Sequence, residues 1–335
     1  MLTDRQLLIL QTIIDEFIET AHPIGSRALS KKPTIDISAA TIRNVMADLE
    51  DMGLLEKTHS SSGRVPSEKG YRYYVDRVIS PTLKARELHL MKHIIQGNLL
   101  ELEQVVQLSA DLLSQLTNYT AIILGPNELD AKLKEIQLIT LTDQTAVAIL
   151  ITDTGHVEHK SLSISPNMSL SDVEKMVNIL NDRLKGVPIT DLGKKLRTEV
   201  YTLMKEHVKN HEIMYDYLKS VLQYEETAKL YIGGSSNIMM QPEFKDVSKI
   251  YEFYTMLENE EELISLLMNY QDGINVTIGN ENQIDAIKHF SLITSPYKLG
   301  TNQIGTIALI GPTRMEYRKV ITLLQSLSNE MTDLL

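Results

Sequence analysis

The residues best suited to chemistry lie in one short segment, Ser38 to Asn44, where hydroxyl, guanidinium and amide groups recur. A side chain such as Arg43 can donate two hydrogen bonds to guanine O6 and N7, and one such as Asn44 can pair with the adenine edge. The Thr41 methyl can contact a thymine methyl. We therefore predict base contacts from Ser38, Thr41, Arg43 and Asn44 in the major groove of a DNA duplex. The alternative is an ordinary solvated helix face, since arginine and asparagine are common there.

These polar residues share a helix with an apolar stripe. Ile42, Val45, Met46 and Leu49 recur at helical spacing, and the Ser38 hydroxyl can cap the helix N-terminus. The stripe predicts that one side of the helix is buried while the side that carries Arg43 and Asn44 stays free. Such a helix could enter the major groove.

The flanking sequence predicts the elements that position this helix. An amphipathic helix should begin after Thr3, and a short helix should begin at Ser26. After Gly53, two strands at 54–59 and 64–66 should enclose a polar turn, and Ser67 should cap a last helix. The order of three helices, a hairpin and a helix is typical of a winged helix-turn-helix, which we place at residues 1–80.

Positive charge is clustered around the predicted reading helix. Residues 1–79 hold ten bases and eleven acids, so most of the net charge of −11 comes from the rest of the chain. Only the N-terminal module is therefore expected to bind a polyanion. The predicted phosphate contacts are Arg27, Lys31, Lys32, Lys57, Ser61, Arg64 and Arg72.

Beyond residue 81, the pattern predicts a helical connector over 83–116, three strands between 135 and 163, and a helix near 170–185. Further strands are expected at 274–278, 290–294 and 305–310, before a C-terminal amphipathic helix. Strands on both sides of a helical stretch suggest one sheet that is split by an insertion. Apolar tyrosines and methionines in that stretch fit an interface or a core equally well.

The sequence gives little evidence for a catalytic site or a metal site. The chain has no cysteine, and its histidine pairs at 89/93, 156/159 and 207/211 lack further ligands at suitable spacing. Gly233 and Gly234 lack both the Walker lysine and the dinucleotide glycine pattern, so a tight turn is favoured. We expect no enzyme, no metal and no cofactor.

The longest aliphatic run, 146–151, is too short to span a bilayer, and no signal pattern is seen. A cytoplasmic protein without membrane contact is therefore expected.

Several motifs resemble the heat-inducible transcription repressor HrcA family. They include Pro23-Ile-Gly-Ser-Arg-Ala-Leu, Ser38-Ala-Ala-Thr-Ile-Arg-Asn-Val-Met, Ser61-Ser-Gly-Arg-Val-Pro-Ser, Tyr231-Ile-Gly-Gly-Ser and Gly305-Thr-Ile-Ala-Leu-Ile-Gly-Pro-Thr-Arg. The resemblance implies a homodimer that binds an inverted-repeat operator, called CIRCE, ahead of chaperone operons and releases it on heat shock. It also implies the chaperonin GroEL as a partner that modulates activity.

The fold class expected from both lines of reasoning is α+β multidomain. The resemblance implies a GAF-like α/β sheet domain that is interrupted by an inserted dimerisation domain. We place the connector and the first part of the sheet domain at 81–189, the insert at 190–268 and the second part at 269–335. A two-fold dimer also matches an inverted repeat, because one winged helix reads few base pairs.

Two other functions stay open at this point. One is a metabolite-responsive regulator whose sheet domain binds a small effector. The other is a noncatalytic scaffold whose winged helix contacts protein, which predicts no salt-dependent binding to a duplex.

Overall fold

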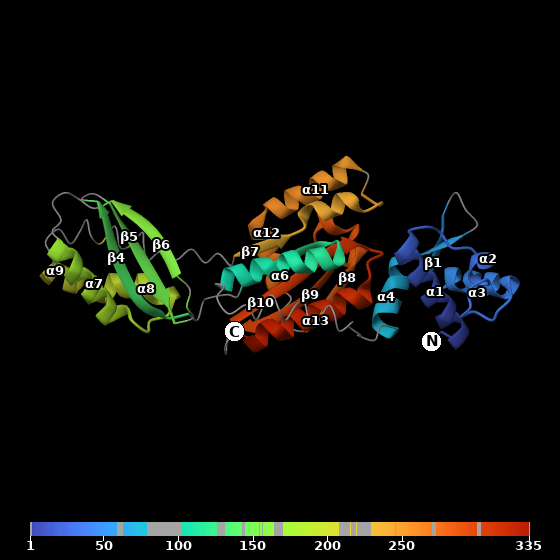
Figure 1. Ribbon diagram of the computed structural model, residues 1–335, viewed down its shortest axis with the longest axis horizontal. Coiled ribbons are helices and arrows are strands. Elements are labelled where there is room, and N and C mark those ends of the chain that lie inside the picture. Colours follow the sequence, from blue (N-terminus) through green and yellow to red (C-terminus); the bar gives the residue numbers. More distant parts are fainter. Residues whose placement is uncertain are drawn as a thin grey trace. The chain divides into compact units, whose positions relative to one another are not determined.

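The chain divides into two compact units, which are described separately. The computed structural model describes residues 2–58, 63–78, 102–125, 131–142, 145–153, 155, 157–163, 170–207, 215, 219, 229–244, 246–269, 273–299 and 303–334. Unit 1 comprises 1–126 and 229–335, and unit 2 comprises 127–228. Figure 1 shows a mixture of helices and sheets, in agreement with the predicted α+β class.

The first part of unit 1, residues 2–78, is called here the N-terminal module. It contains α1 (Asp4–Thr20), α2 (Ser26–Leu29), α3 (Ala39–Asp51), β1 (Leu55–Lys57), β2 (Arg64–Pro66) and α4 (Glu68–Arg77). Thr3 and Gln6 form a capping box at the start of α1, and Ser67 caps α4. The buried side chains of Ile13, Leu29 and Leu49 belong to the hydrophobic core of the module. The order of elements is therefore the one expected from the sequence.

The second part of unit 1 is called here the sheet domain. Its five strands, all antiparallel, lie in the order β7-β3-β10-β9-β8. The strand bounds are β3 (Thr120–Leu124), β7 (Leu230–Gly233), β8 (Asn275–Ile278), β9 (Phe290–Leu299) and β10 (Gln303–Pro312). Because β3 precedes the insertion and the other four strands follow it, one sheet is split as predicted, but its first part is β3 and not the strands predicted between 135 and 163, which form a separate sheet.

Helices cover both faces of this sheet (Figure 1). On one face, α6 (Leu102–Thr117) and α13 (Tyr317–Leu334) share a core with Ile123, Ile293 and Leu309. On the other face, Phe253 of α11 (Val247–Glu258) stacks on Phe290 with ring centroids 5.0 Å apart. That side also holds η3 (Ser235–Met240) and α12 (Glu260–Met268), while η4 (Gly279–Glu281) and η5 (Asp285–Ile287) follow β8.

Unit 2, called here the insert, has its own sheet and core. Its sheet has the order β4-β5-β6, with β4 (Leu133–Thr142), β5 (Thr145–Thr152) and β6 (Val157–Ser163). Its described helices are α7 (Leu170–Leu184), α8 (Ile189–Lys195), η2 (Leu196–Val200) and α9 (Tyr201–His207). Leu150, Leu180 and Leu192 are among the buried side chains of a core separate from that of unit 1.

The predicted domain boundaries are therefore corrected. The insert spans 127–228 instead of 190–268, because, among the described residues, the strands between 133 and 163 pair with one another and pack on α7–α9. Helices α11 and α12, assigned to the insert from the sequence, instead cover the five-stranded sheet. The predicted connector falls partly outside the described residues, which resume at α6.

Candidate nucleic-acid interface

The helix α3 has two distinct sides. Ile42, Val45, Met46 and Leu49 are buried in the module core, as predicted. Arg43 and Asn44 are exposed, and so are Ala40 and Ala47 on the same side. A surface of small residues with one guanidinium and one amide can approach base edges closely.

Ser38 and Thr41 hold the N-terminal end of this helix. The Ser38 hydroxyl accepts a hydrogen bond from Thr41 N at 3.2 Å, and its oxygen lies 2.9 Å from Thr41 Oγ1. Ser38 is exposed, whereas Thr41 is half-buried. Both predicted base contacts are thus engaged in capping in this structure, and Ser38 has a definite structural role.

Three predicted phosphate ligands are exposed bases on the surface of the module. Arg27 lies in α2, Lys31 follows that helix, and Lys57 ends β1. Within the described part of the chain, no salt bridge involves any of these three side chains. The positive charges of these three bases are therefore available to an external anion. Ser61, the uncharged member of the predicted set, lies outside the described residues.

Three other predicted phosphate ligands bind carboxylates of the protein itself. Lys32 contacts Glu16, and Arg72 contacts Glu281. Arg64 pairs with Glu50, with Nε and Nη2 at 2.7 and 2.6 Å from the same carboxylate oxygen, and its side chain is only 16% exposed. These ion pairs favour structural roles, because a neutralised cation adds little attraction for phosphate. Composition and spacing gave no signal for the Arg72 partner, which is 209 positions away in the sequence.

Acidic residues lie toward the other end of α3. Asp48 and Asp51 are exposed in its second half, whereas Arg43 lies in its first half. The positive N-terminal end of the helix dipole adds to this asymmetry. An anion should therefore meet the N-terminal half of α3, where the exposed predicted base contacts lie.

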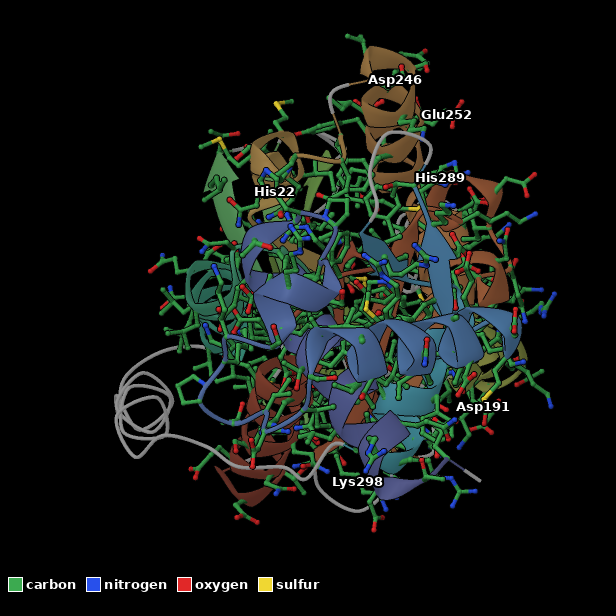
Figure 2. The ribbon with its side chains drawn as sticks, turned by 90° about the vertical axis from the view of Figure 1, so that its right-hand side faces the viewer. His22, Asp191, Asp246, Glu252, His289 and Lys298 are labelled. Atoms are coloured by element: carbon green, nitrogen blue, oxygen red, sulfur yellow. The ribbon has the colours of Figure 1, made fainter. Side chains whose placement is uncertain are left out.

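The side chains of the N-terminal module are seen in the foreground of Figure 2, where His22 marks the turn after α1. No group of three potential metal ligands occurs among the residues whose placement is described.

Gly234 adopts a φ of +64° and precedes η3. A Cβ on Gly233 would lie 2.5 Å from the carbonyl oxygen of Ala110, so this glycine serves close packing against α6. Gly234 is accordingly explained by the turn before η3, and Gly233 by its packing in β7.

Buried tyrosines also offer no reactive group at neutral pH. Burial raises the pKa of Tyr119 to about 12, and burial likewise raises the pKa of Tyr317 well above its ordinary value. These phenols therefore stay protonated: the Tyr317 hydroxyl donates to the Thr313 carbonyl oxygen at 2.6 Å, and the Tyr119 hydroxyl accepts from Glu316 N at 3.2 Å. None of the described helices is long and apolar enough to cross a bilayer.

Comparison with known proteins identifies similar chains. A family model described as the HrcA protein C terminal domain matches residues 103–321. The chain is 59% identical over 335 residues to the heat-inducible transcription repressor HrcA of Oceanobacillus iheyensis, covering 100% of this chain and 98% of that protein.

Solved structures add information on the fold. A crystal structure described as a hypothetical protein at 2.2 Å resolution has a TM-score of 0.67 and 23% identity, with both chains covered completely. At that identity the likeness shows a shared fold alone. An IclR family transcriptional regulator from Brucella abortus has 9% identity and a TM-score of 0.22, with 100% and 95% of the two chains covered.

Proposed function

Because the chain belongs to the HrcA family of heat-inducible transcription repressors, which are not enzymes, we propose that it represses chaperone operons through an inverted-repeat operator. In this proposal a homodimer places two winged helix-turn-helix modules on the CIRCE operator and releases it on heat stress. The chaperonin GroEL modulates the fraction of competent repressor. The GAF-like sheet domain and the insert hold the two modules together.

The observation that carries the proposal is the free polar side of α3. Arg43 and Asn44 are exposed on a helix whose opposite side is fixed in a core, and exposed bases lie on neighbouring elements. Arg43 and Asn44 are proposed to read bases, whereas Arg27, Lys31 and Lys57 are proposed to contact phosphates. Such a division gives both sequence discrimination and salt dependence.

An apolar outer face on the insert supports the dimer. The buried residues of β5 alternate with Val147, Ile149 and Ile151, which are only partly buried. On the neighbouring strands, Ile139 and Val157 are 48% and 54% exposed. Registers of the sheet bring Val147 opposite Ile139 and Ile151 opposite Val157, so these side chains form one patch. A second copy that covers this patch would remove it from water.

The test is binding of the full chain to three duplexes: an inverted repeat, a single half-site and a scrambled sequence. We expect affinity in that order, with log affinity falling linearly as log salt concentration rises. Lys31→Ala should weaken all three duplexes similarly and reduce the salt slope by about one. Glu19→Gln, which removes an exposed acid from the far end of α1, is the matched control.

Failure to bind any duplex at low salt would reject the proposal in favour of a protein-binding scaffold. Equal affinity for the inverted repeat and the scrambled duplex would reject sequence-specific repression. Adding the chaperonin, and warming the complex, then tests the two proposed modes of control separately.

A further inference from the structure

The N-terminal module is docked on the sheet domain through α4. Arg72 Nε donates to Glu281 Oε1 at 2.9 Å, and Arg72 Nη2 donates to the Val276 carbonyl oxygen at 2.6 Å. One turn earlier, Glu68 accepts hydrogen bonds from Asn280 N at 3.2 Å and from Asn280 Nδ2 at 3.1 Å. Two charged residues of α4 are thus held by the end of β8 and the η4 turn.

The η4 turn is shaped for this contact. Gly279 has a φ of +55°, and a Cβ built there would lie 2.0 Å from Glu68 Oε1. Any larger residue would have to displace the Glu68 carboxylate. Glu281 also accepts from Ile278 N at 2.9 Å, which orients its carboxylate toward Arg72.

A second set of contacts joins the module to the region of α13. Arg314 Nη1 donates to the Ile18 carbonyl oxygen at 3.2 Å, near the end of α1. The rings of Tyr71 and Tyr317 lie 5.8 Å apart at 47°, and both side chains are almost fully buried. The core residues of the module and of the sheet domain consequently form one continuous cluster.

This docking leaves the predicted reading surface open. The contacts use α4, the end of α1 and β8, whereas Arg43 and Asn44 on α3 remain exposed. The docked module can therefore meet a duplex without first separating from the sheet domain. A fixed module also loses less orientational freedom when the second of two linked modules binds its half-site, which increases affinity for the paired sites.

We propose that the Arg72–Glu281 and Glu68–Asn280 contacts are a docking latch that orients the DNA-reading module for two-site binding. This inference rests on the proposed function, because it concerns how two modules in a dimer engage one inverted repeat. When the latch is closed, the second module is presented at a fixed orientation to the second half-site. Arg72 and Glu281 are positioning residues and make no contact with the duplex.

The first test replaces Glu281→Gln in the full chain and compares affinity for the inverted repeat with affinity for a half-site. We expect that ratio to fall about tenfold, which is part of the hundredfold or more that linkage can supply. Half-site affinity should stay unchanged, because a loosened module still reads its own bases. Asp285→Asn is the matched control: its carboxylate pairs with Lys288 at 2.6 Å in the next short helix.

A covalent latch gives the second test. The chain has no cysteine, so Glu68→Cys combined with Asn280→Cys provides the only two thiols for a short bis-maleimide. The crosslinked protein should form readily without DNA and should keep its preference for the inverted repeat. Before crosslinking, the double variant should behave like Glu281→Gln.

Each outcome decides between the two hypotheses. The latch alone would be rejected if the parent protein prefers the inverted repeat and Glu281→Gln shows the same ratio of inverted-repeat affinity to half-site affinity. Crosslinked protein that no longer binds the inverted repeat would also reject it, since docking would then inhibit binding. Parent protein that binds none of the duplexes would reject the proposed function and the orienting role together.

Discussion

Arg43 is the residue from which we expect most of the base discrimination. It is exposed in the first half of α3, beside Asn44 and away from the acidic end of the helix. Arg43→Ala should weaken the preferred operator by about 1–3 kcal/mol, because a bidentate contact to guanine is lost. The effect should be seen as relaxed preference at particular base pairs in competition binding with operators substituted one position at a time.

The matched control for this prediction is Lys57→Ala, which removes another exposed base from the same module. If Lys57 contacts phosphate alone, its loss should weaken every duplex to a similar degree. An equal loss on operator and random DNA for Arg43→Ala would contradict a base-reading role.

Glu281 gives the docking latch a defined pH dependence. Burial tends to raise the pKa of its carboxyl, but hydrogen bonds from the Arg72 guanidinium and the Ile278 N–H hold that pKa below its ordinary 4.5. Its stabilising contribution is therefore complete above about pH 4.5 and is lost as pH falls through the lower folded-state pKa. The stability difference between parent and Glu281→Gln should shrink in that acidic range.

Denaturant unfolding at a series of pH values measures this difference directly. Asp285→Asn tests a carboxyl whose pKa is also lowered, in this case by its contact with Lys288, but which lies outside the latch. A difference between parent and Glu281→Gln that stays constant from neutral pH to pH 3 would contradict the assigned contribution.

At the scale of elements, Gly70 allows α4 to pack closely against the backbone of Leu54, just before β1. A Cβ at this position would lie 2.2 Å from the Leu54 carbonyl oxygen, which is backbone and cannot rotate away. Gly70→Ala should lower the free energy of unfolding by about 1–3 kcal/mol through overpacking, despite the better helix propensity of alanine. Urea denaturation should show a lower midpoint.

Gly25→Ala is the matched control in the same module, since nothing lies within 4 Å of a Cβ there. It should change stability by much less. Comparable losses from the two substitutions would mean that the space around Gly70 does not account for its effect.

The elements of the N-terminal module could be predicted because their signals are local. Ser38 followed by an apolar stripe at helical spacing is enough to place α3, and Gly53 is enough to end it. Strand β3 was missed: Thr120–Leu124 is a short apolar run, buried at every position, which lacks the alternation of a half-exposed strand. Its neighbours in the sheet, β7 and β10, come from the other side of the insertion.

The ion-pair partners of charged side chains likewise could not be predicted from the local sequence. Arg64 pairs with Glu50 across the module, and Arg72 pairs with Glu281 in the sheet domain. The charges of these two arginines are therefore already neutralised, unlike those of Arg27 and Lys31, and only the fold reveals this. Clusters of bases predicted a positive surface, but the sequence did not say which bases would already be neutralised.

At the scale of the whole molecule, the domain boundary was the main error. Burial alternates along β5 although the strand is apolar throughout 146–151, and such a pattern fits a strand of any sheet, so it did not reveal that β4–β6 form a separate sheet. The sequence patterns of the helices after residue 229 fit the insert and the sheet domain equally well. Only long-range pairing, such as β3 with β7, decides the assignment.

The corrected boundary places the proposed dimer contact on the sheet of the insert. Ile149 lies in the central strand of the insert, on the apolar outer face between Gln137 and His159. Ile149→Lys should shift the protein from dimer to monomer, because burying an unpaired ammonium at the centre of an interface is unfavourable. Light scattering coupled to gel filtration measures the mass, and unfolding of the insert is excluded by unchanged circular dichroism.

Thr190→Lys is the charge-matched control, since Thr190 is exposed on α8, which packs on the opposite side of this sheet. It should leave both the mass and operator binding unchanged. The monomer from Ile149→Lys should bind a half-site like the parent but lose the gain from two linked modules on the inverted repeat. A variant that stays dimeric would place the two-fold contact elsewhere, and a monomer with undiminished inverted-repeat affinity would remove the need for a dimer in repression.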